Sequence, residues 1–404
     1  MKFTHVLSVV ILLLGLSSAE AQDQPKAQRY PPLPINKGKP AGKAPDGMVL
    51  IPGGWFWMGT DDVNHPESGP VHKVYVDAVW MDETEITNVM WAKFVGETGY
   101  KTVAERKPHP SLFPNVPPEN LKGIAPFSLV FTPPAMPVRN LTEHLQWWKA
   151  GKGANWQHPL GPKSDIKKKA NHPVVHICWL DAVLYCNWRS HKAKLQPCYD
   201  LFKGKAKRRL TVFDACKLSD DDFFALKISV PTNVLKRTGY RPPTEAEWEF
   251  AARGGMNQKK YTWGDKLTPK GKHMANIWQG KFPNQNTRKD GFYRTAPVKS
   301  FPPNGYGLYD MAGNVWEWCQ DWYHPEYYKF PPAKNPKKNP PGPANAFQPK
   351  PPGELKRVQR GGSFLCHESY CVRYLTYARG KGEFSSASDP TGFRCVRSAI
   401  LKKQ

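Results

Sequence analysis

The apolar positions of this chain form short, interrupted runs that predict short strands and few helices. Residues 48–59 consist of two apolar runs on either side of a Gly-Gly pair, which predicts a strand, a turn and a second strand. Residues 71–81 alternate between apolar and polar positions and predict a further strand. The ordered part of the chain therefore begins near Asp46.

Three segments carry helix signals. Thr87 is a candidate N-cap and Gly99 a candidate C-terminal stop for a helix between them. A second helix is expected over 180–190, and a third over 244–254, where Thr244 and Glu247 have the spacing of a capping box. The apolar stripe of the first helix consists of Val89, Trp91, Phe94 and Val95, and the buried side of the second of Ala182, Val183, Cys186 and Trp188.

The N-terminus has the pattern of an export signal. Lys2 and His5 precede an apolar run from residue 6 to residue 16, and a small-residue cleavage site ends at Ala21. The apolar run is too short to span a bilayer, so we expect residues 1–21 to be removed and the protein to be exported without a transmembrane anchor. Residues 22–45 contain little to bury and predict a disordered linker.

Length allows two or three ordinary domains, but the proline and glycine content favours one irregular, loop-rich fold. The chain has 404 residues with 41 prolines and 32 glycines, while 15 tryptophans supply bulky side chains for a core. Its net charge of +24 raises the question of polyanionic partners, yet no recognised nucleic-acid module accompanies it. Much of the excess lies in basic runs at 167–169, 203–209 and 334–338, the last two within insertions at about 195–240 and 325–355. We interpret these runs as solvated surface, with polyanion binding as the alternative.

A pair of cysteines near the C-terminus is the leading candidate for chemistry. Cys366 and Cys371 form a C-x4-C pair behind a double glycine and Ser363. Such spacing allows two soft sulfur ligands to converge on one metal ion, and two thiolates suit Cu(I) better than a hard cation. A structural disulfide is the competing interpretation in an exported chain.

Other segments allow both a structural and a functional interpretation. Trp147, Trp148 and Trp156 lie in a polar, glycine-containing loop, where they could cap the core or form the wall of a peptide groove. Residues 276–292 and 306–318 are rich in oxygen ligands and kinked by glycine, as in ordinary turns or in Ca2+ sites.

The remaining cysteines predict bracing. Cys198 and Cys216 both fall in the first insertion, and a local disulfide is the simplest use of that pair in an exported loop.

The run from Arg360 to Tyr374, continued by Gly392-Phe-Arg-Cys395, resembles the active-site segment of the formylglycine-generating enzymes, also called sulfatase-modifying factors. The Trp147-Trp148, Gly-Ala-Asn-Trp156 and Gly-Asn-x-Trp-Glu-Trp segments are similar to the same family. The resemblance implies a single irregular α+β domain over 46–400, with low regular secondary structure and a twisted antiparallel sheet, related to C-type lectins. It also implies a copper-dependent oxidase that uses O2 to convert the cysteine of a Cys-x-Pro-x-Arg motif in unfolded type I sulfatases to Cα-formylglycine.

Several residue roles follow from the resemblance alone. Cys366 and Cys371 would hold copper, with Ser363 beside the oxygen site, and Cys186 and Cys395 would form a disulfide. Cys178 and Cys319 then remain without an assigned partner, so we expect them to be buried as small apolar side chains. A second family disulfide is absent, because Ala252 and Thr376 stand at its positions. The pocket would include Asn314, Trp316, His367, Tyr370 and Arg373. One calcium site would use Asn276, Ile277, Asp290 and Phe292, and the other Asp310, Met311, Gly313 and Val315, with Glu85 as an added candidate.

Two alternatives remain at this point. A non-catalytic member of the same fold would bind carbohydrate or protein, although loss of either Cys366 or Cys371 would have favoured that interpretation more. A related iron-dependent sulfoxide synthase needs a histidine-bearing helical bundle ahead of the domain, for which residues 22–45 leave no room. We expect a monomer that does not bind nucleic acid.

Overall fold

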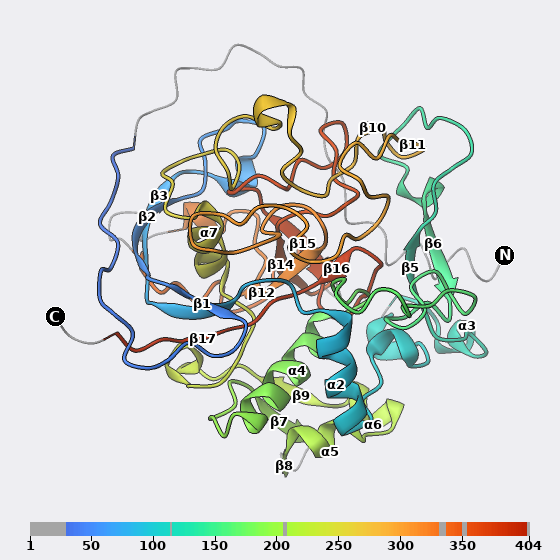
Figure 1. The fold of residues 1–404 in the computed structure, drawn as a ribbon. Coiled ribbons are helices and arrows are strands. Elements are labelled where there is room, and N and C mark those ends of the chain that lie inside the picture. Colours follow the sequence, from blue (N-terminus) through green and yellow to red (C-terminus); the bar gives the residue numbers. More distant parts are fainter. Residues whose placement is uncertain (1–29, 114, 205–207, 331–336, 350–353, 402–404) are drawn as a thin grey trace.

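The computed structural model describes residues 30–401 except 114, 205–207, 331–336 and 350–353. It is a mixed α+β structure in which short helices and small sheets are joined by long loops, as the fold class predicts (Figure 1). The helices are α2 (Asn88–Thr98), α3 (Pro118–Leu121), α4 (Trp179–Lys192), α5 (Val212–Cys216), α6 (Asp220–Phe224) and α7 (Glu245–Arg253).

The strands form small sheets that are mostly antiparallel, although the β12–β16 and β13–β3 pairs are parallel. The four-stranded sheet has the order β15 (Gly380–Glu383), β14 (Lys356–Arg360), β12 (Trp316–Trp322) and β16 (Thr391–Gly392). Three-stranded sheets are β1 (Met48–Ile51), β4 (Val79–Asp82) and β17 (Val396–Ser398); β13 (Lys337–Lys338), β3 (His72–Val76) and β2 (Gly54–Met58); and β8 (Arg208–Leu210), β7 (Asp200–Lys203) and β9 (Lys227–Ser229). Two hairpins pair β5 (Phe127–Phe131) with β6 (Trp148–Lys152) and β10 (Gly280–Lys281) with β11 (Gln285–Asn286).

The four-stranded sheet positions the cysteine loop, because that loop leaves directly from the end of β14. Glu317 on β12 is opposite Arg360, the last residue of β14. Glycines on β15 make room for tryptophans of β12: a Cβ on Gly380 would lie 2.4 Å from Trp316 Cζ3, and one on Gly382 would lie 2.6 Å from Trp318 Cη2. These close approaches hold β15 against the aromatic face of β12.

The predicted helices are present, with local chemistry at their ends. The Thr244 side chain accepts a hydrogen bond from the Glu247 amide at 3.2 Å, and the Glu247 carboxylate accepts one from the Thr244 amide at 2.8 Å. Thr87 caps α2, and Gly99 ends it with φ 67°. One part of the α2 prediction is wrong: Val89 is 53% exposed, because α2 packs through Trp91 and Phe94.

Residues 30–45 are attached to the domain, although the sequence predicts a linker there. The Trp55 amide donates to Pro34 O at 3.0 Å, and the Asn36 amide donates to Gly53 O at 3.1 Å. Pro40 forms a bridge with Leu401 near the other end of the chain. The predicted signal peptide and residues 22–29 lie outside the described residues.

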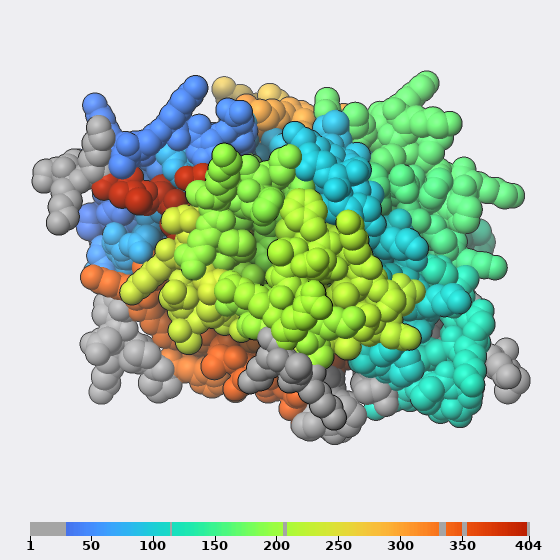
Figure 2. All heavy atoms as spheres, turned by 90° about the horizontal axis from the view of Figure 1, so that it is seen from below, coloured from blue at the N-terminus to red at the C-terminus, as the bar shows by residue number. Residues whose placement is uncertain are grey.

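The first insertion is part of the core and not a detachable surface loop. Its residues cover the centre of the face seen in Figure 2, and Tyr199, Leu201 and Phe223 are buried in the same cluster as Trp91 of α2. Removing residues 195–240 would therefore expose the apolar side chains beneath them.

The local disulfide expected in this insertion is not formed, because its two cysteines face different neighbours. Cys198 lies beside Arg237 and Arg241, whereas the thiol of Cys216 contacts Thr98 of α2, and both thiols are free.

The second insertion is also partly built into a sheet. Lys337 and Lys338 form β13, which pairs with β3 at Val74 and Tyr75.

In the part of the chain that the structure describes, no helix is long and apolar enough to cross a bilayer.

Candidate active site

A double glycine turns the chain into the cysteine loop. Gly361 and Gly362 have φ values of 87° and 71°, a left-handed conformation that favours glycine. A Cβ on Gly361 would lie 3.2 Å from Trp248 Cζ2, and one on Gly362 would lie 3.1 Å from Cys366 Sγ. The glycines are needed because the backbone turns sharply and the Cys366 sulfur packs directly against it.

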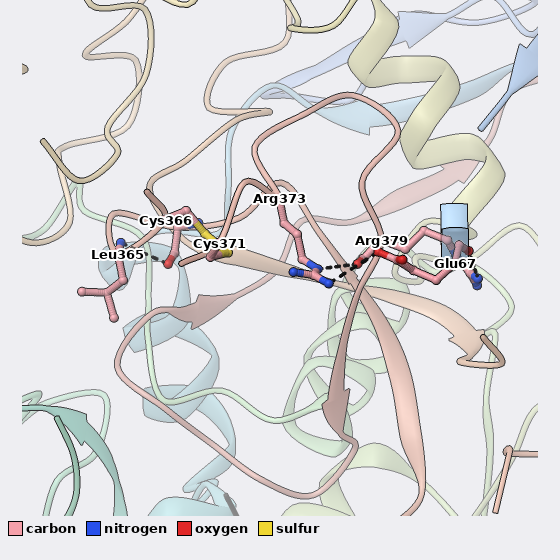
Figure 3. Close-up of a disulfide and its surroundings, with 7 residues drawn as sticks. Glu67, Leu365, Cys366, Cys371, Arg373 and Arg379 are labelled. Atoms are coloured by element: carbon pink, nitrogen blue, oxygen red, sulfur yellow. Dashed lines mark hydrogen bonds and ion pairs between the residues drawn. A yellow bond between two sulfur atoms is a disulfide. The ribbon is translucent and has the colours of Figure 1, made fainter. Parts of the chain in front are cut away.

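Cys366 and Cys371 come together as their spacing predicts, and here they form a disulfide with Cα atoms 4.7 Å apart (Figure 3). The loop between them is a tight turn in which the Cys371 amide donates to His367 O at 2.7 Å. The Ser363 amide lies 3.4 Å from Cys366 Sγ and donates to it, while Ser363 Oγ accepts from the Leu365 amide at 3.3 Å. Cys366 is 1% and Cys371 7% exposed, so the sulfur pair is shielded from bulk water.

Arg373 lies near the disulfide but is held by other groups. Its Nε donates to the Arg379 carbonyl at 2.7 Å, and its guanidinium lies 3.4 Å from Glu67 Oε1. Figure 3 shows this arginine between the cysteine pair and the Glu67–Arg379 region. Arg373 therefore ties the cysteine loop to residues near the N-terminal side of the domain.

Asn314 and Trp316 approach the cysteine loop from the start of β12. Asn314 O accepts the Phe364 amide at 2.9 Å, and Asn314 Nδ2 donates to Glu85 Oε2 at 2.7 Å. Trp316 is half-buried and packs in the cluster that contains Cys366 and Cys371. Both predicted pocket residues are thus brought to the site, Asn314 as a buried brace and Trp316 as a wall.

His367 and Tyr370 both lie on the loop between the two cysteines and differ in their contacts. The Ser369 amide donates to His367 Nδ1 at 3.2 Å, so the neutral imidazole carries its proton on Nε2, and burial lowers the pKa of this histidine. Tyr370 stacks on Phe282 with ring centres 4.2 Å apart. Burial raises the pKa of Tyr370, an effect that the indole N–H groups of the Trp148 and Trp147 side chains partly offset.

The three loop tryptophans are buried, which does not fit a groove wall. Trp147 is 0% exposed and packs edge-on against Phe282 and Tyr370, beneath the cysteine loop. Trp148 belongs to the same cluster. Trp156 lies in a different cluster, the main core around α2 and α4, so its predicted contact with a peptide is not supported by its position.

The first predicted calcium set converges around Asp290. Its carboxylate accepts the Ile277 amide at 3.0 Å, the Phe292 amide at 3.0 Å and the Gln279 side-chain amide at 2.7 Å. Asn276 lies nearby, where its carbonyl accepts the Asn314 amide at 2.8 Å. Burial raises the pKa of Asp290, an effect that these donors partly offset.

The second predicted calcium set contains two buried carboxylates. Glu85 accepts the Val315 amide at 3.1 Å, and burial together with the neighbouring Asp310 carboxylate raises its pKa. Asp310 accepts the Lys299 amide at 2.9 Å, and burial raises its pKa to about 6. Gly313 forms a bridge with Asn276, so the two sets are adjacent. Over the described ranges no three His, Cys, Asp or Glu side chains converge as a metal site, and each predicted set contributes at most two carboxylates.

The other cysteines are buried and free. Cys186 and Cys395 face each other with their sulfurs 3.5 Å apart, which brings the predicted pair together without a bond. Cys178 and Cys319 are buried as expected.

A cavity of about 480 Å³ opens beside the cysteine loop, and no sequence pattern predicted it. His367, Glu368 and Tyr374 line one side, and Trp263 and Trp278 contribute aromatic walls. The available signals were the Tyr261-Thr-Trp263 alternation and an acidic residue inside the C-x4-C segment, neither of which identifies a cavity by itself.

Comparison with known proteins gives one family over nearly the whole domain. The model of the sulfatase-modifying factor enzyme 1-like domain matches residues 36–399. A formylglycine-generating enzyme of Mus musculus is 38% identical over 92% of this chain and 81% of its own length. One of Streptomyces coelicolor is 39% identical over 88% of this chain and 90% of its own. An inactive Cα-formylglycine-generating enzyme 2 of Mus musculus is 33% identical over 88% of this chain and 87% of its own.

Solved structures share the fold at low sequence identity. Treponema denticola variable protein 1 superposes with a TM-score of 0.53 and 22% identity, over 87% of this chain and 94% of its own. PvdO from Pseudomonas aeruginosa gives a TM-score of 0.50 and 22% identity over the same shares. These likenesses concern the fold alone.

Proposed function

The chain belongs to the family of the sulfatase-modifying factor enzyme 1-like domain, and we propose that it converts a cysteine of sulfatase polypeptides to Cα-formylglycine. The observation that carries the proposal is the buried Cys366–Cys371 pair, held by the double-glycine turn. Family membership alone is insufficient, because inactive relatives share the fold.

Copper(I) fits the cysteine pair once the disulfide is reduced to two thiolates. The sulfurs already adjoin, the Ser363 amide donates toward one of them, and aromatic side chains limit access of water. Bound by Cys366 and Cys371, copper would supply the activation of O2 that the oxidation of a thiol-bearing carbon to an aldehyde requires.

The chain's own residues would bind and orient the substrate. Trp316 stands beside the cysteine pair as a rigid, half-exposed wall. His367 lines the adjacent cavity and presents an Nε2–H that can donate to a peptide carbonyl. Tyr370, whose pKa is raised by burial, remains protonated and supports the loop from beneath.

Calcium fits the Glu85–Asp310 region as a structural ion. Two neighbouring buried carboxylates with raised pKa values repel each other when ionised, and a divalent cation would remove that repulsion. Asp290 fits less directly, because burial alone, and not a second carboxylate, raises its pKa, and its amide donors partly offset that effect. We assign both ions a role in bracing the loops and not in the reaction.

The polypeptide client would be an unfolded type I sulfatase, met by an exported enzyme after removal of residues 1–21. The Cys-x-Pro-x-Arg motif is the segment we expect it to bind. Modification of an extended chain is required, because a folded client would bury its cysteine.

The test is conversion of a Cys-x-Pro-x-Arg peptide by the purified protein with Cu(I) and O2, read by mass and by trapping of the aldehyde with hydroxylamine. A peptide with serine in place of cysteine and the Cys371→Ser variant are the controls. If the wild-type protein binds copper yet forms no aldehyde, the non-catalytic alternative is favoured instead.

A further inference from the structure

The β13–β3–β2 sheet has one buried face and one outer face. The buried face packs against α7, where Phe56 meets Phe250 edge-on with ring centres 5.3 Å apart. β2 and β3 lie at the edge of the molecule, so the opposite face of the sheet is turned outward (Figure 1). Because successive side chains of a strand point to opposite faces, the outer face carries Trp55, Trp57, Lys73, Tyr75 and Lys338.

Two lysines of this outer face lie over one tryptophan ring. Lys73 Nζ is 4.9 Å and Lys338 Nζ 6.0 Å from the centre of the Trp55 ring. Among the described residues neither ammonium group has a carboxylate or a hydrogen-bond partner. Two like charges near one ring repel each other, and a bound anion would remove that repulsion. The lysine pair is therefore suited to an anionic group.

A cavity of about 440 Å³ shares Tyr75 with the outer face and extends it. Lys37 lines this cavity, is exposed, and has no ion-pair partner within the described ranges. Arg241 also lines it, and although this side chain is only 1% exposed, its Nε has no hydrogen-bond partner in that part of the chain. The cavity therefore adds two cationic side chains with unused donors.

The carboxylates that line the same cavity are already engaged. Asp77 accepts a hydrogen bond from Asn339 Nδ2 at 2.7 Å. Glu247 accepts from both terminal nitrogens of Arg241, at 2.6 and 2.7 Å. The donors that remain free at this surface are consequently positive, and a polymer that carries many negative groups fits them better than a neutral one.

The aromatic side chains favour a sugar polymer over a nucleic acid or a membrane. The lysines cover a face of Trp55 on which a base would have to stack. The Trp55 indole N–H has no acceptor among the described residues, so it can donate to a sugar oxygen. Trp57 is half-buried and its Nε1 donates to Pro31 O at 2.7 Å, unlike a ring that inserts into lipid.

We propose that the outer face of the β13–β3–β2 sheet and the adjoining cavity bind an acidic polysaccharide through Lys73, Lys338 and Lys37. Sulfate or carboxylate groups of the polymer pair with the ammonium groups, and sugar oxygens accept from the Trp55 indole. The net charge of +24, for which the proposed reaction has no use, draws such a polymer to the protein. None of these residues lines the cavity beside the cysteine loop, so the surface is separate from the proposed active site.

The test compares one polymer with and without its charge. Dextran sulfate and neutral dextran of equal length are titrated into the purified protein and followed by calorimetry. We expect only dextran sulfate to bind, with an affinity that falls as salt is added, because pairing with lysines releases counterions from the polymer. Polygalacturonate, which carries carboxylates in place of sulfates, is the second charged probe. Binding of either charged polymer supports the surface, and binding of neither overturns it.

A double substitution locates the binding. Lys73→Gln with Lys338→Gln should weaken binding of the charged polymer at least about tenfold and make its salt dependence shallower. Lys73→Arg with Lys338→Arg keeps both charges and should retain binding. Lys122→Gln with Lys163→Gln is the matched control, because both lysines are exposed and neither lines the cavity. Equal weakening by the two glutamine pairs would reduce the effect to net charge and overturn the proposal.

Two further measurements test the kind of polymer and the separation from the active site. Tighter binding of single-stranded DNA or of phosphatidylglycerol vesicles than of dextran sulfate would overturn the choice of a polysaccharide. Peptide conversion by the Lys73→Gln, Lys338→Gln protein should equal that of the wild type, and a parallel loss of conversion would overturn a separate surface. The titrations require neither copper nor turnover, so they test the surface independently of the proposed reaction.

Discussion

Replacing Arg360 by methionine should destabilise the fold at the point where the cysteine loop begins. Arg360 is fully buried and donates to Glu245 at 3.1 Å and to Glu249 at 2.8 Å. It also donates to the carbonyls of Thr376 at 2.7 Å and Tyr377 at 3.2 Å. Methionine fills much of the same volume but satisfies none of these acceptors.

The size of the loss can be estimated from the partners that remain. Removing one side of a buried ion pair costs roughly 3–5 kcal/mol, since an unpaired charge is left in the core. Glu249 keeps Arg253 at 2.7 Å and Glu245 keeps Arg379 at 2.7 Å, which reduces the cost, whereas the two carbonyls lose their side-chain donor. We expect Arg360→Met to lower the free energy of unfolding by about 4 kcal/mol.

Urea unfolding followed by tryptophan fluorescence measures this change. Arg209→Met is the matched control, because the Arg209 side chain is 67% exposed and its partner Asp200 also pairs with Arg237. That substitution should cost less than about 1 kcal/mol. Unfolding of the two variants at the same urea concentration would contradict this prediction, because burial would then have no effect on what an ion pair contributes to stability.

Three further predictions concern the core, the metal and pH. Trp156→Ala should lower the free energy of unfolding by about 3–5 kcal/mol in urea titrations, because the indole is buried, and equal stability of the variant would contradict this. Cys366→Ser and Cys371→Ser should each lose stoichiometric copper by elemental analysis, and retention by either would remove the metal from the mechanism. The folded pKa of Asp310, about 6, lies above its ordinary value, so its contribution to stability is present at low pH and lost as pH rises toward and through 6. In chelator, Asp310→Asn should therefore be more stable than wild type at pH 8 by about 3 kcal/mol but not at pH 4, and parallel pH curves would exclude Asp310 as the cause.

The sequence predicted the contacts between residues that are close along the chain. The Thr244–Glu247 capping box and the Gly99 stop are formed by residues within a few positions of each other, so their spacing determined the outcome. The C-x4-C pair belongs to the same class, because one tight turn brings Cys366 and Cys371 together.

The sequence did not predict the contacts between distant segments. Residues 30–45 have the composition of a linker, yet the Pro34 carbonyl accepts a hydrogen bond from the Trp55 amide on the edge of β2. Cys198 and Cys216 are close in sequence, but Cys198 lies beside Arg241 whereas Cys216 contacts α2. The composition of a segment gives no information about which edge or face it will meet.

Tryptophan shows the same limit for function. Trp147 and Trp156 both lie in a polar loop, and both could equally cap a core or form a wall. The outcome depended on Phe282 and Tyr370, which cover Trp147 from other segments. Rigid aromatic area is useful in a groove and in a core for the same physical reason, so residue type alone cannot separate the two.

The positions of the two cysteines depend on contacts within their own loop. Cys366 and Cys371 are buried, and the double-glycine turn and the Ser363 amide determine their position. Glu368 is exposed and lies on the turn between them without a contact that the sulfurs require. A substitution at Glu368 should therefore leave metal binding intact, whereas a substitution in the glycine turn should abolish it.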